Sequence, residues 1–308
     1  MVAESSTSVR LAESRAIDGR FGLLRGGYVG TFLRNWQGLI GLSLIVTFSL
    51  LAIFAPVLAP SDPQEINLAH ILAPPAWSDS DRGFGLLGTD NLGRDILSRV
   101  IHGSRVSLLV GISATLIGLF VGVPMGLIAG YKGRPLDDII TRFADIQSAI
   151  PFLVLLIAIL TFIGGGLLNV VIFLGLSGWI GYARLVRGET LSIRTRDFVI
   201  SARAVGASEA RIMFHHILPN VVAPIIIAAT LSFGGMILTE SALSFLGIGV
   251  SASTPTWGRM LAESRQDILS AFGPSLFPGV AIVAVVLGAN WTGDWLRDVL
   301  DPRLRGSR

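Results

Sequence analysis

Few residues in this 308-residue chain have the types and spacing that catalysis or metal binding requires. Lys132 is the single lysine, and Gly133 and Arg134 follow it, so the chain lacks the G-x-x-x-x-G-K-[ST] loop that cradles nucleotide phosphates. Cysteine is absent, which excludes disulfides and thiolate metal sites. His215 and His216 are adjacent, so on a helix their side chains point about 100° apart, and no third ligand is near in the sequence. We therefore predict no catalytic residue, no metal site and no cofactor on this chain.

The composition indicates that the chain is a membrane protein. Hydrophobic residues make up 51% of the chain and charged residues only 15%, whereas a soluble domain carries about 25% charged residues. The mean hydropathy is +0.67. The net charge of +3 is a modest excess of the kind that reports membrane topology, so no nucleic-acid partner is predicted.

Apolar segments of sufficient length to cross ~30 Å of hydrocarbon predict an all-α integral membrane protein with six transmembrane helices. The predicted spans are 37–59, 106–129, 143–163, 168–186, 221–241 and 276–296. Only the turn at Gly164, Gly165 and Gly166 separates the third span from the fourth. The first 36 residues carry arginines but no apolar run, so the first span is predicted to be an uncleaved helix rather than a secretory signal.

The distribution of cations predicts the orientation. Of 24 Lys and Arg residues, 18 fall in the segments 1–36, 130–142, 184–220 and 297–308, and the loops 60–105 and 242–275 hold the other six. By the positive-inside rule both termini are cytoplasmic. The predicted organisation is a cytoplasmic tail 1–36, an extracytoplasmic loop 60–105, a transmembrane core 106–296 and a cytoplasmic tail 297–308.

The segment 196–220 lies in the long cytoplasmic loop 187–220 and has the pattern of two short helices. Asp197 and Ser208 are suited to cap helix N-termini, and Gly206 can adopt the backbone angles that end the first helix. Pro219 fits the first turn of the next span. We predict a rigid elbow, residues 197–219, on the cytoplasmic face.

This segment resembles the cytoplasmic loop of ABC importer permeases, which carries E-A-A, three residues, G, nine residues and then I-x-L-P. Ala202, Gly206, Leu218 and Pro219 match at that spacing. Ile200 and Ser201 stand where the pattern has Glu and the first Ala, and His216 stands where it has Ile.

Further motifs are similar to those of the C-type (second) permease of the dipeptide, oligopeptide and nickel group, from about residue 34 to the C-terminus. They include G-T-D at 88–90, G-R-D at 93–95, S-R at 98–99, G-S-R at 103–105, S-L at 107–108, A-V-G-A-S at 204–208, H-I-L-P-N at 216–220, L-S-F-L-G at 243–247, P-T-W-G at 255–258 and L-D-P-R at 300–303. Several motifs in the same order make a chance match improbable.

The resemblance implies a transport subunit, not an enzyme, in a prokaryotic cytoplasmic (inner) membrane. It implies an importer core of five helices plus an added N-terminal helix, paired with a related B-type permease as a heterodimer. Two cytoplasmic ATPase subunits or domains would bind ATP and Mg, and an extracytoplasmic binding protein would deliver the cargo. The cargo it implies is short peptides, with nickel or another small solute as the alternative.

The resemblance also implies that the elbow docks in a groove of the ATPase, a role that small residues suit. The residues expected to couple the two subunits are Ala202, Arg203, Ala204, Gly206, Ala207, Ser208, Glu209, Arg211, His216, Leu218 and Pro219. The alternative is a basic loop that only sets topology.

Two further features of the spans carry predictions. Gly118, Gly122, Gly126 and Gly130 recur at every fourth position, so a neighbouring helix can approach closely, either inside the bundle or along the pathway or permease interface. Glu240 is about 20 residues beyond the inner end of its span, or ~30 Å along it, which predicts a place near the outer face. There it could contact the amino terminus of a peptide at an outer gate, or cap local structure.

Two other classes of protein would show different sequences. A stand-alone secondary transporter or channel would have inverted repeats, midspan charges and interrupted helices, none of which is clear here. A membrane-embedded enzyme would cluster His, Asp or Glu within the spans. Here ionisable residues are mainly near span ends, and Asp145 and Arg184 near the inner face are expected to snorkel or form a salt bridge.

Overall fold

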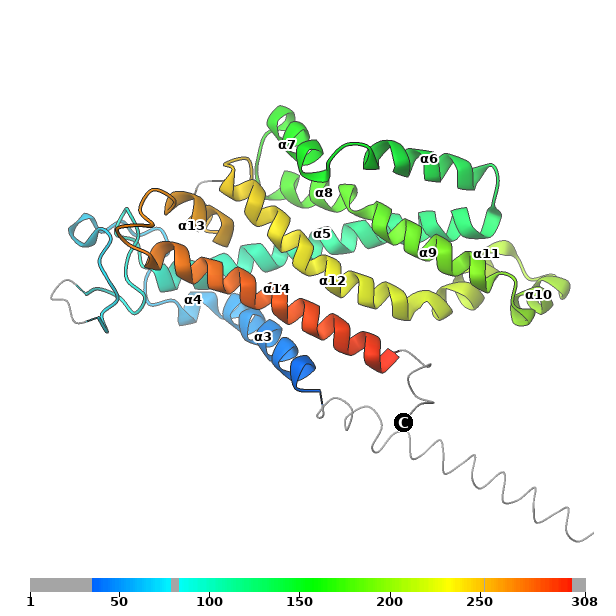
Figure 1. Ribbon diagram of the computed structural model, residues 1–308, viewed down its shortest axis with the longest axis horizontal. Helices are drawn as coiled ribbons and strands as arrows, with labels where there is room; N and C mark the ends of the chain where they lie inside the picture. Colours follow the sequence, from blue (N-terminus) through cyan, green and yellow to red (C-terminus); the bar gives the residue numbers. More distant parts are fainter. Residues whose placement is uncertain (1–34, 79–82, 252, 301–308) are drawn as a thin grey trace, which may run out of the picture.

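The computed structural model describes residues 35–78, 83–251 and 253–300, and these form an elongated bundle of helices (Figure 1). The only strand-like pairing within them is an isolated bridge between Thr89 and Asp95. The predicted all-α fold is therefore confirmed. The predicted tail 1–36 lies almost wholly outside the described residues, as does the end of the tail 297–308 with most of the L-D-P-R motif.

The helices follow one another along the chain with short connections, apart from two longer loops. They are α3 (Trp36–Ile53), α4 (Ala55–Leu58), η2 (Leu68–His70), α5 (Ile96–Lys132), α6 (Leu136–Ser148), α7 (Phe152–Ile163), α8 (Leu167–Ser177), α9 (Trp179–Ile193), α10 (Asp197–Ala204), α11 (Glu209–Arg211), η3 (Ile212–Ile217), α12 (Leu218–Phe245), α13 (Trp257–Glu263) and α14 (Gly273–Leu300). One of the longer loops precedes α5, and the other contains α13.

Helix α5 begins well before the span predicted at 106–129. Asp95 caps its N-terminus by accepting a hydrogen bond from the backbone N–H of Ser98 at 2.7 Å. Ser98 and Arg99 are buried. Ser98 accepts a hydrogen bond from the backbone N–H of Ser61 at 3.1 Å and Arg99 pairs with Asp90 and Glu263, which explains why polar residues can extend an apolar helix. Residues 96–105, which were predicted to be part of the loop 60–105, are thus helix.

The third predicted span, 143–163, is not one straight helix. Its residues fall in α6 and α7, whose axes differ by 83°. Pro151 precedes α7, lacks a backbone N–H and restricts the residue before it, so α6 cannot continue through this point. The expectation of uninterrupted spans is therefore wrong here. Among the described residues, five helices are long and apolar enough to span a membrane, or six if the bent pair is one span, so the predicted count of six stays a prediction.

The fourth predicted span, 168–186, corresponds to α8 and α9, which together cover Leu167–Ile193. The turn before it is made by Gly164 and Gly166, with φ of +98° and +128°. Few residues other than glycine adopt such angles, so the predicted tight turn is confirmed.

Helix α5 is the central element of the bundle and packs closely on α9. A Cβ atom at Gly122 would lie 2.4 Å from the carbonyl oxygen of Trp179, and one at Gly126 would lie 2.5 Å from that of Ala183. The backbones can approach this closely only because side chains are missing.

The added helix α3 lies along α14 (Figure 1). A Cβ at Gly41 of α3 would lie 2.8 Å from the carbonyl oxygen of Gly288 of α14. The added helix is therefore fitted to the core by the same kind of close backbone contact.

Candidate functional site

The elbow consists of α10, a turn, α11 and the π-helical segment η3, which continues into α12. Gly206 ends the first helix with φ +82°, and the next residue, Ala207, donates its backbone N–H to the carbonyl of Ala202 at 3.1 Å. Ser208 caps the second helix by accepting from the N–H of Arg211 at 3.4 Å, and Pro219 lies in the first turn of α12. These three predictions are confirmed.

The capping role predicted for Asp197 is wrong by one position. Arg196 is the N-cap residue of α10, with extended backbone angles and no side-chain capping bond, and Asp197 is in the first turn. An aspartate in the first turn still interacts favourably with the positive end of the helix dipole. Asp197 therefore marks the start of the helix, but one residue after the N-cap.

Buried apolar side chains attach the elbow to the end of the bundle. Val199 and Ile217 are fully buried, and Ile212 is nearly so. They pack in one cluster with Leu127 of α5 and Val186 of α9. The elbow therefore has little freedom to move without the helices beneath it.

The predicted coupling residues differ in how far their side chains are exposed. Arg203, Ala204, Gly206, Ser208, Glu209, Arg211 and Pro219 are exposed, while Ala207, His216 and Leu218 are half-buried and Ala202 is buried. Ala202 belongs to the cluster that anchors the elbow, so its small side chain serves internal packing rather than an outward contact.

Four large apolar residues of the elbow are exposed, and none of them was predicted from the sequence to be a coupling residue: Phe198, Ile200, Val205 and Phe214. Val205 is 85% exposed and Phe214 is 52% exposed. The available signal was an apolar residue within a charged loop, next to the glycine that ends the helix. Large apolar side chains exposed together commonly mark contact sites for other proteins.

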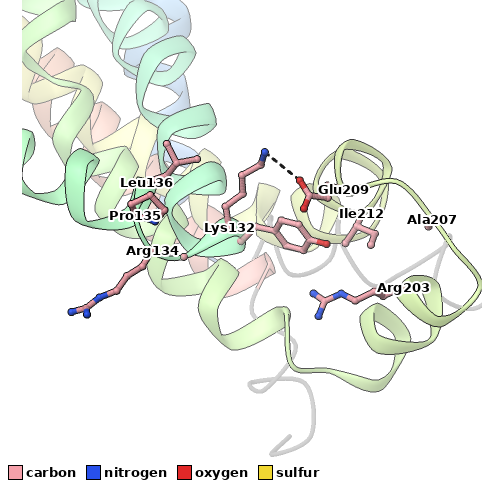
Figure 2. Close-up of a pocket in the computed structure, with 10 residues that line it drawn as sticks. Lys132, Arg134, Pro135, Leu136, Arg203, Ala207, Glu209 and Ile212 are labelled. Atoms are coloured by element: carbon pink, nitrogen blue, oxygen red, sulfur yellow. Dashed lines mark ion pairs between the residues drawn. The ribbon is translucent and has the colours of Figure 1, made fainter.

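Ion pairs surround the elbow and the neighbouring helix ends. Lys132 at the end of α5 pairs with Glu209 of α11 at 3.2 Å (Figure 2). Arg184 of α9 pairs with Asp145 of α6 at 2.8 Å, as the salt-bridge alternative predicted. All four side chains are more than a third exposed, so these contacts contribute little stability.

The two features predicted within the spans are both internal in this conformation. The four glycines of α5 face α9, with Gly118 beside Tyr182 and Gly130 beside Thr190. Glu240 is fully buried and accepts a hydrogen bond from Ser244 at 2.7 Å. Its burial fits the role in local structure better than contact with a solute at an outer gate.

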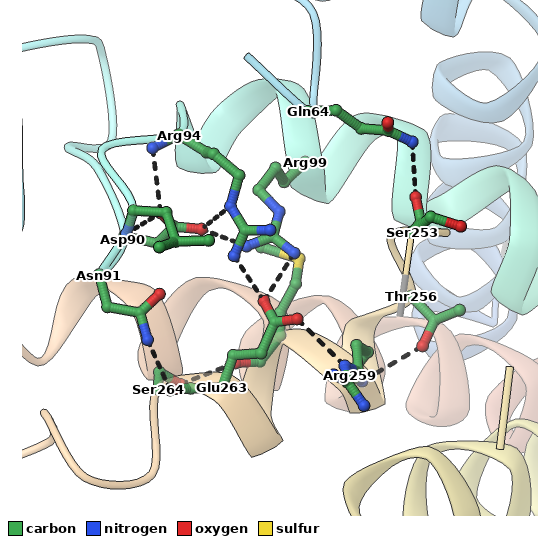
Figure 3. Close-up of polar contacts among 12 residues, drawn as sticks. Gln64, Asp90, Asn91, Arg94, Arg99, Ser253, Thr256, Arg259, Glu263 and Ser264 are labelled. Atoms are coloured by element: carbon green, nitrogen blue, oxygen red, sulfur yellow. Dashed lines mark hydrogen bonds and ion pairs between the residues drawn. The ribbon is translucent and has the colours of Figure 1, made fainter. Parts of the chain in front are cut away.

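An ionic cluster at the end of the bundle opposite the elbow joins residues that are distant in the sequence (Figure 3). Arg94 bridges Asp90 and Glu263, at 2.7 Å in each case, and Arg99 also pairs with both acids. Arg259 contacts the other oxygen of Glu263 at 3.0 Å. The G-T-D and G-R-D motifs therefore tie the loop before α5, and the start of α5, to α13.

The electrostatics of this cluster favour the ionised carboxylate. Burial alone would raise the pKa of Glu263, but the guanidinium of Arg99, and then those of Arg94 and Arg259, hold that pKa below its ordinary value. The sequence motifs pointed to two of the arginines and to Asp90, but nothing in the sequence pointed to Glu263.

Comparison with known proteins assigns the family. Residues 122–306 match the family model of the binding-protein-dependent transport system inner membrane component. The chain therefore belongs to this family of membrane transport subunits. Residues 29–75, which include the added helix, match the model of the N-terminal TM domain of oligopeptide transport permease C. The resemblance to C-type permeases of ABC importers is thus confirmed.

Individual relatives match over most of the chain. This chain is 46% identical over 272 residues to the dipeptide transport system permease protein of Alkalihalophilus pseudofirmus, and the match covers 88% of both chains. It is 43% identical over 277 residues to the di/tripeptide transport system permease protein of Pseudomonas aeruginosa, covering 90% of this chain and 91% of the relative. A solved structure of the methionine ABC transporter MetNI, in an inward-facing conformation, aligns with a TM-score of 0.56 and 20% identity, covering 67% of this chain and 98% of that one. This last likeness supports the fold alone.

Proposed function

We propose that this chain is the C-type permease subunit of an ATP-driven importer of short peptides and forms half of the translocation pathway. Two relatives named as dipeptide and di/tripeptide permeases, matched over about nine tenths of the chain, support the cargo. The elbow supports the coupling role, because it is anchored to three core helices and still exposes Val205 and Phe214.

The partners follow from that role. A related B-type permease would complete the pathway, an extracytoplasmic binding protein would deliver peptides, and two cytoplasmic ATPase subunits or domains would bind ATP and Mg. The excess of Lys and Arg in the segments around the elbow and in both tails supports cytoplasmic termini in a prokaryotic inner membrane. The chain itself then supplies no catalytic group.

The proposed coupling is mechanical. Val205 and Phe214 would seat in an apolar groove of the ATPase, with the exposed charges of Arg203 and Arg211 at the rim. Because the underside of the elbow is packed into the bundle, closure of the ATPases would displace the inner ends of α5, α9 and α12 together.

The test is transport by the complete complex in proteoliposomes. Uptake of a labelled dipeptide should require ATP on the cytoplasmic side, both permeases and the binding protein. Uptake by this chain alone without ATP would contradict the importer role. ATP-driven uptake of nickel or another solute, with dipeptides neither carried nor competing, would contradict the peptide cargo.

A further inference from the structure

A cavity of about 580 Å³ lies between the end of α5 and the elbow (Figure 2). From α5 and the following turn it is lined by Tyr131 and Lys132, among others, and from the elbow by Arg203, Ala207, Glu209 and Ile212. The wall is therefore shared between the surface proposed to dock on the ATPase and a turn that the sequence analysis did not associate with docking.

The charges in this cavity do not balance. Lys132 and Glu209 neutralise one another at 3.2 Å. Arg134 of the turn pairs with Asp138 at 3.2 Å, and its side chain points out of the cavity. In the part of the chain that the structure describes, no carboxylate pairs with Arg203. The cavity therefore carries one uncompensated positive charge.

The guanidinium of Arg203 is held in place by an aromatic ring. Its central carbon lies 5.6 Å from the centre of the Tyr131 ring, within the range of a cation–π contact. An arginine already oriented in this way loses less conformational freedom when it binds a carboxylate through two parallel hydrogen bonds. The geometry thus favours recognition of a carboxylate over a diffuse attraction of anions.

We propose that this cavity, the Arg203 socket, receives an acidic side chain from the cytoplasmic ATPase and makes the α5–α6 turn a second contact surface beside the elbow. The proposal rests on the proposed function. It is supported by charge complementarity and by continuity, because Val205 is two residues beyond Arg203 and is 85% exposed on the same elbow. Tyr131 and Ile212 provide apolar wall for the methylene groups of an Asp or Glu.

The experiment measures the affinity of the purified ATPase for the paired permeases in nanodiscs of zwitterionic lipid, as a function of salt. Arg203→Ala should weaken binding about tenfold at low salt and flatten its salt dependence, since hydrogen bonds to charged groups are among the stronger contacts. Tyr131→Phe should bind like the wild type, while Tyr131→Leu should lose part of the affinity because it loses the ring. Arg134→Ala is the matched control: its side chain points out of the cavity, so its loss should weaken binding far less than Arg203→Ala does.

The outcomes distinguish failure of the Arg203 socket from failure of the proposed coupling role of the elbow. If Arg203→Ala binds and transports like the wild type, whereas Gly206→Trp loses coupled transport, the socket is refuted and the proposed function stands. If Gly206→Trp also transports normally, the elbow role itself fails. An effect of Arg203→Ala seen only in nanodiscs with anionic lipid would assign the cavity to a lipid headgroup and overturn the proposal. A compensating acid-to-lysine change in the ATPase that rescues Arg203→Glu would support it directly.

Discussion

The backbone of Gly258 lies directly against the backbone of Ser241. A Cβ atom at Gly258 would be 2.4 Å from both the Cα and the carbonyl oxygen of Ser241, which leaves no space for any side chain. The contact presses the start of α13 onto α12, beside the buried Glu240. At the other end of α13, Glu263 is held by three arginines, so this short helix is fixed at both ends.

We predict that Gly258→Ala destabilises the protein by about 1–3 kcal/mol, because neither backbone can yield without disturbing its helix. Thermal unfolding of the purified protein, followed by intrinsic fluorescence, measures the change. Gly279→Ala in α14 is the control, since its Cβ would meet only Leu261 at 3.9 Å. Equal unfolding temperatures for the two variants would contradict the close contact.

Glu263→Gln should cost about 3 kcal/mol of unfolding free energy. The change removes the negative charge shared by Arg94 and Arg99, and Arg99 is only 2% exposed, so a buried cation is left with Asp90 as its one remaining acid. Chemical denaturation in detergent provides the measurement. The exposed pair offers a matched comparison, since Asp145→Asn should cost less than about 1 kcal/mol.

The ionic cluster around Glu263 also predicts a pH dependence of stability. The folded-state pKa of Glu263 is lowered from its ordinary value of 4.5, so the unfolded chain binds the proton more readily than the folded chain. Its contribution to stability is therefore fully present above 4.5 and is lost as the pH falls through the lowered folded-state pKa. Unfolding curves recorded from neutral to acidic pH should fall more steeply for the wild type than for Glu263→Gln. Parallel curves would refute this assignment.

Replacement of Gly122 in α5 should separate α5 from α9. Gly122→Leu places a side chain where a Cβ would already be 2.4 Å from a carbonyl oxygen, whereas Gly118→Ala meets the edge of Tyr182 at 3.1 Å and should be tolerated better. Yield and monodispersity in detergent would report the packing defect. A Gly122→Leu variant that is fully stable but transports nothing would instead favour a place along the pathway.

Substitutions of Gly206 should affect coupling with little effect on stability. Its φ of +82° disfavours most side chains, yet no atom lies within 4 Å of a Cβ built there. Gly206→Trp should therefore distort the elbow and abolish ATP-driven uptake, while Gly206→Asn should retain most of it, because asparagine tolerates this backbone region. ATP hydrolysis and peptide uptake measured on the same proteoliposomes would show whether the two remain coupled.

Local signals in the sequence were sufficient where the structure depends on local chemistry. Gly206, Ser208 and Pro219 act through their own backbone geometry or through groups a few residues away, so their roles could be predicted. The bend between α6 and α7 was missed because Pro151 lies inside an apolar run that satisfies the length of a span. A hydropathy criterion counts apolar residues and is insensitive to where a helix breaks.

Contacts across long sequence separations could not be predicted from one chain. Arg99 and Glu263 are 164 residues apart, and the early start of α5 at Ile96 depends on the partners that bury Ser98 and Arg99. The exposure of Val205 is likewise a tertiary result, because it depends on which face of α10 is packed onto α5 and α9. Periodicity along the chain carries no information on these pairings.

The helical segment Glu209–Phe245 runs without a loop for 37 residues, or about 55 Å. It starts in the elbow, at the residue that pairs with Lys132, and passes Glu240 and Ser241 before it ends beside α13. A displacement of the elbow can therefore reach the contact with α13 along a single helical segment. Communication between the two ends of the bundle then depends on the stiffness of this segment, which includes the π-helical η3 and Pro224.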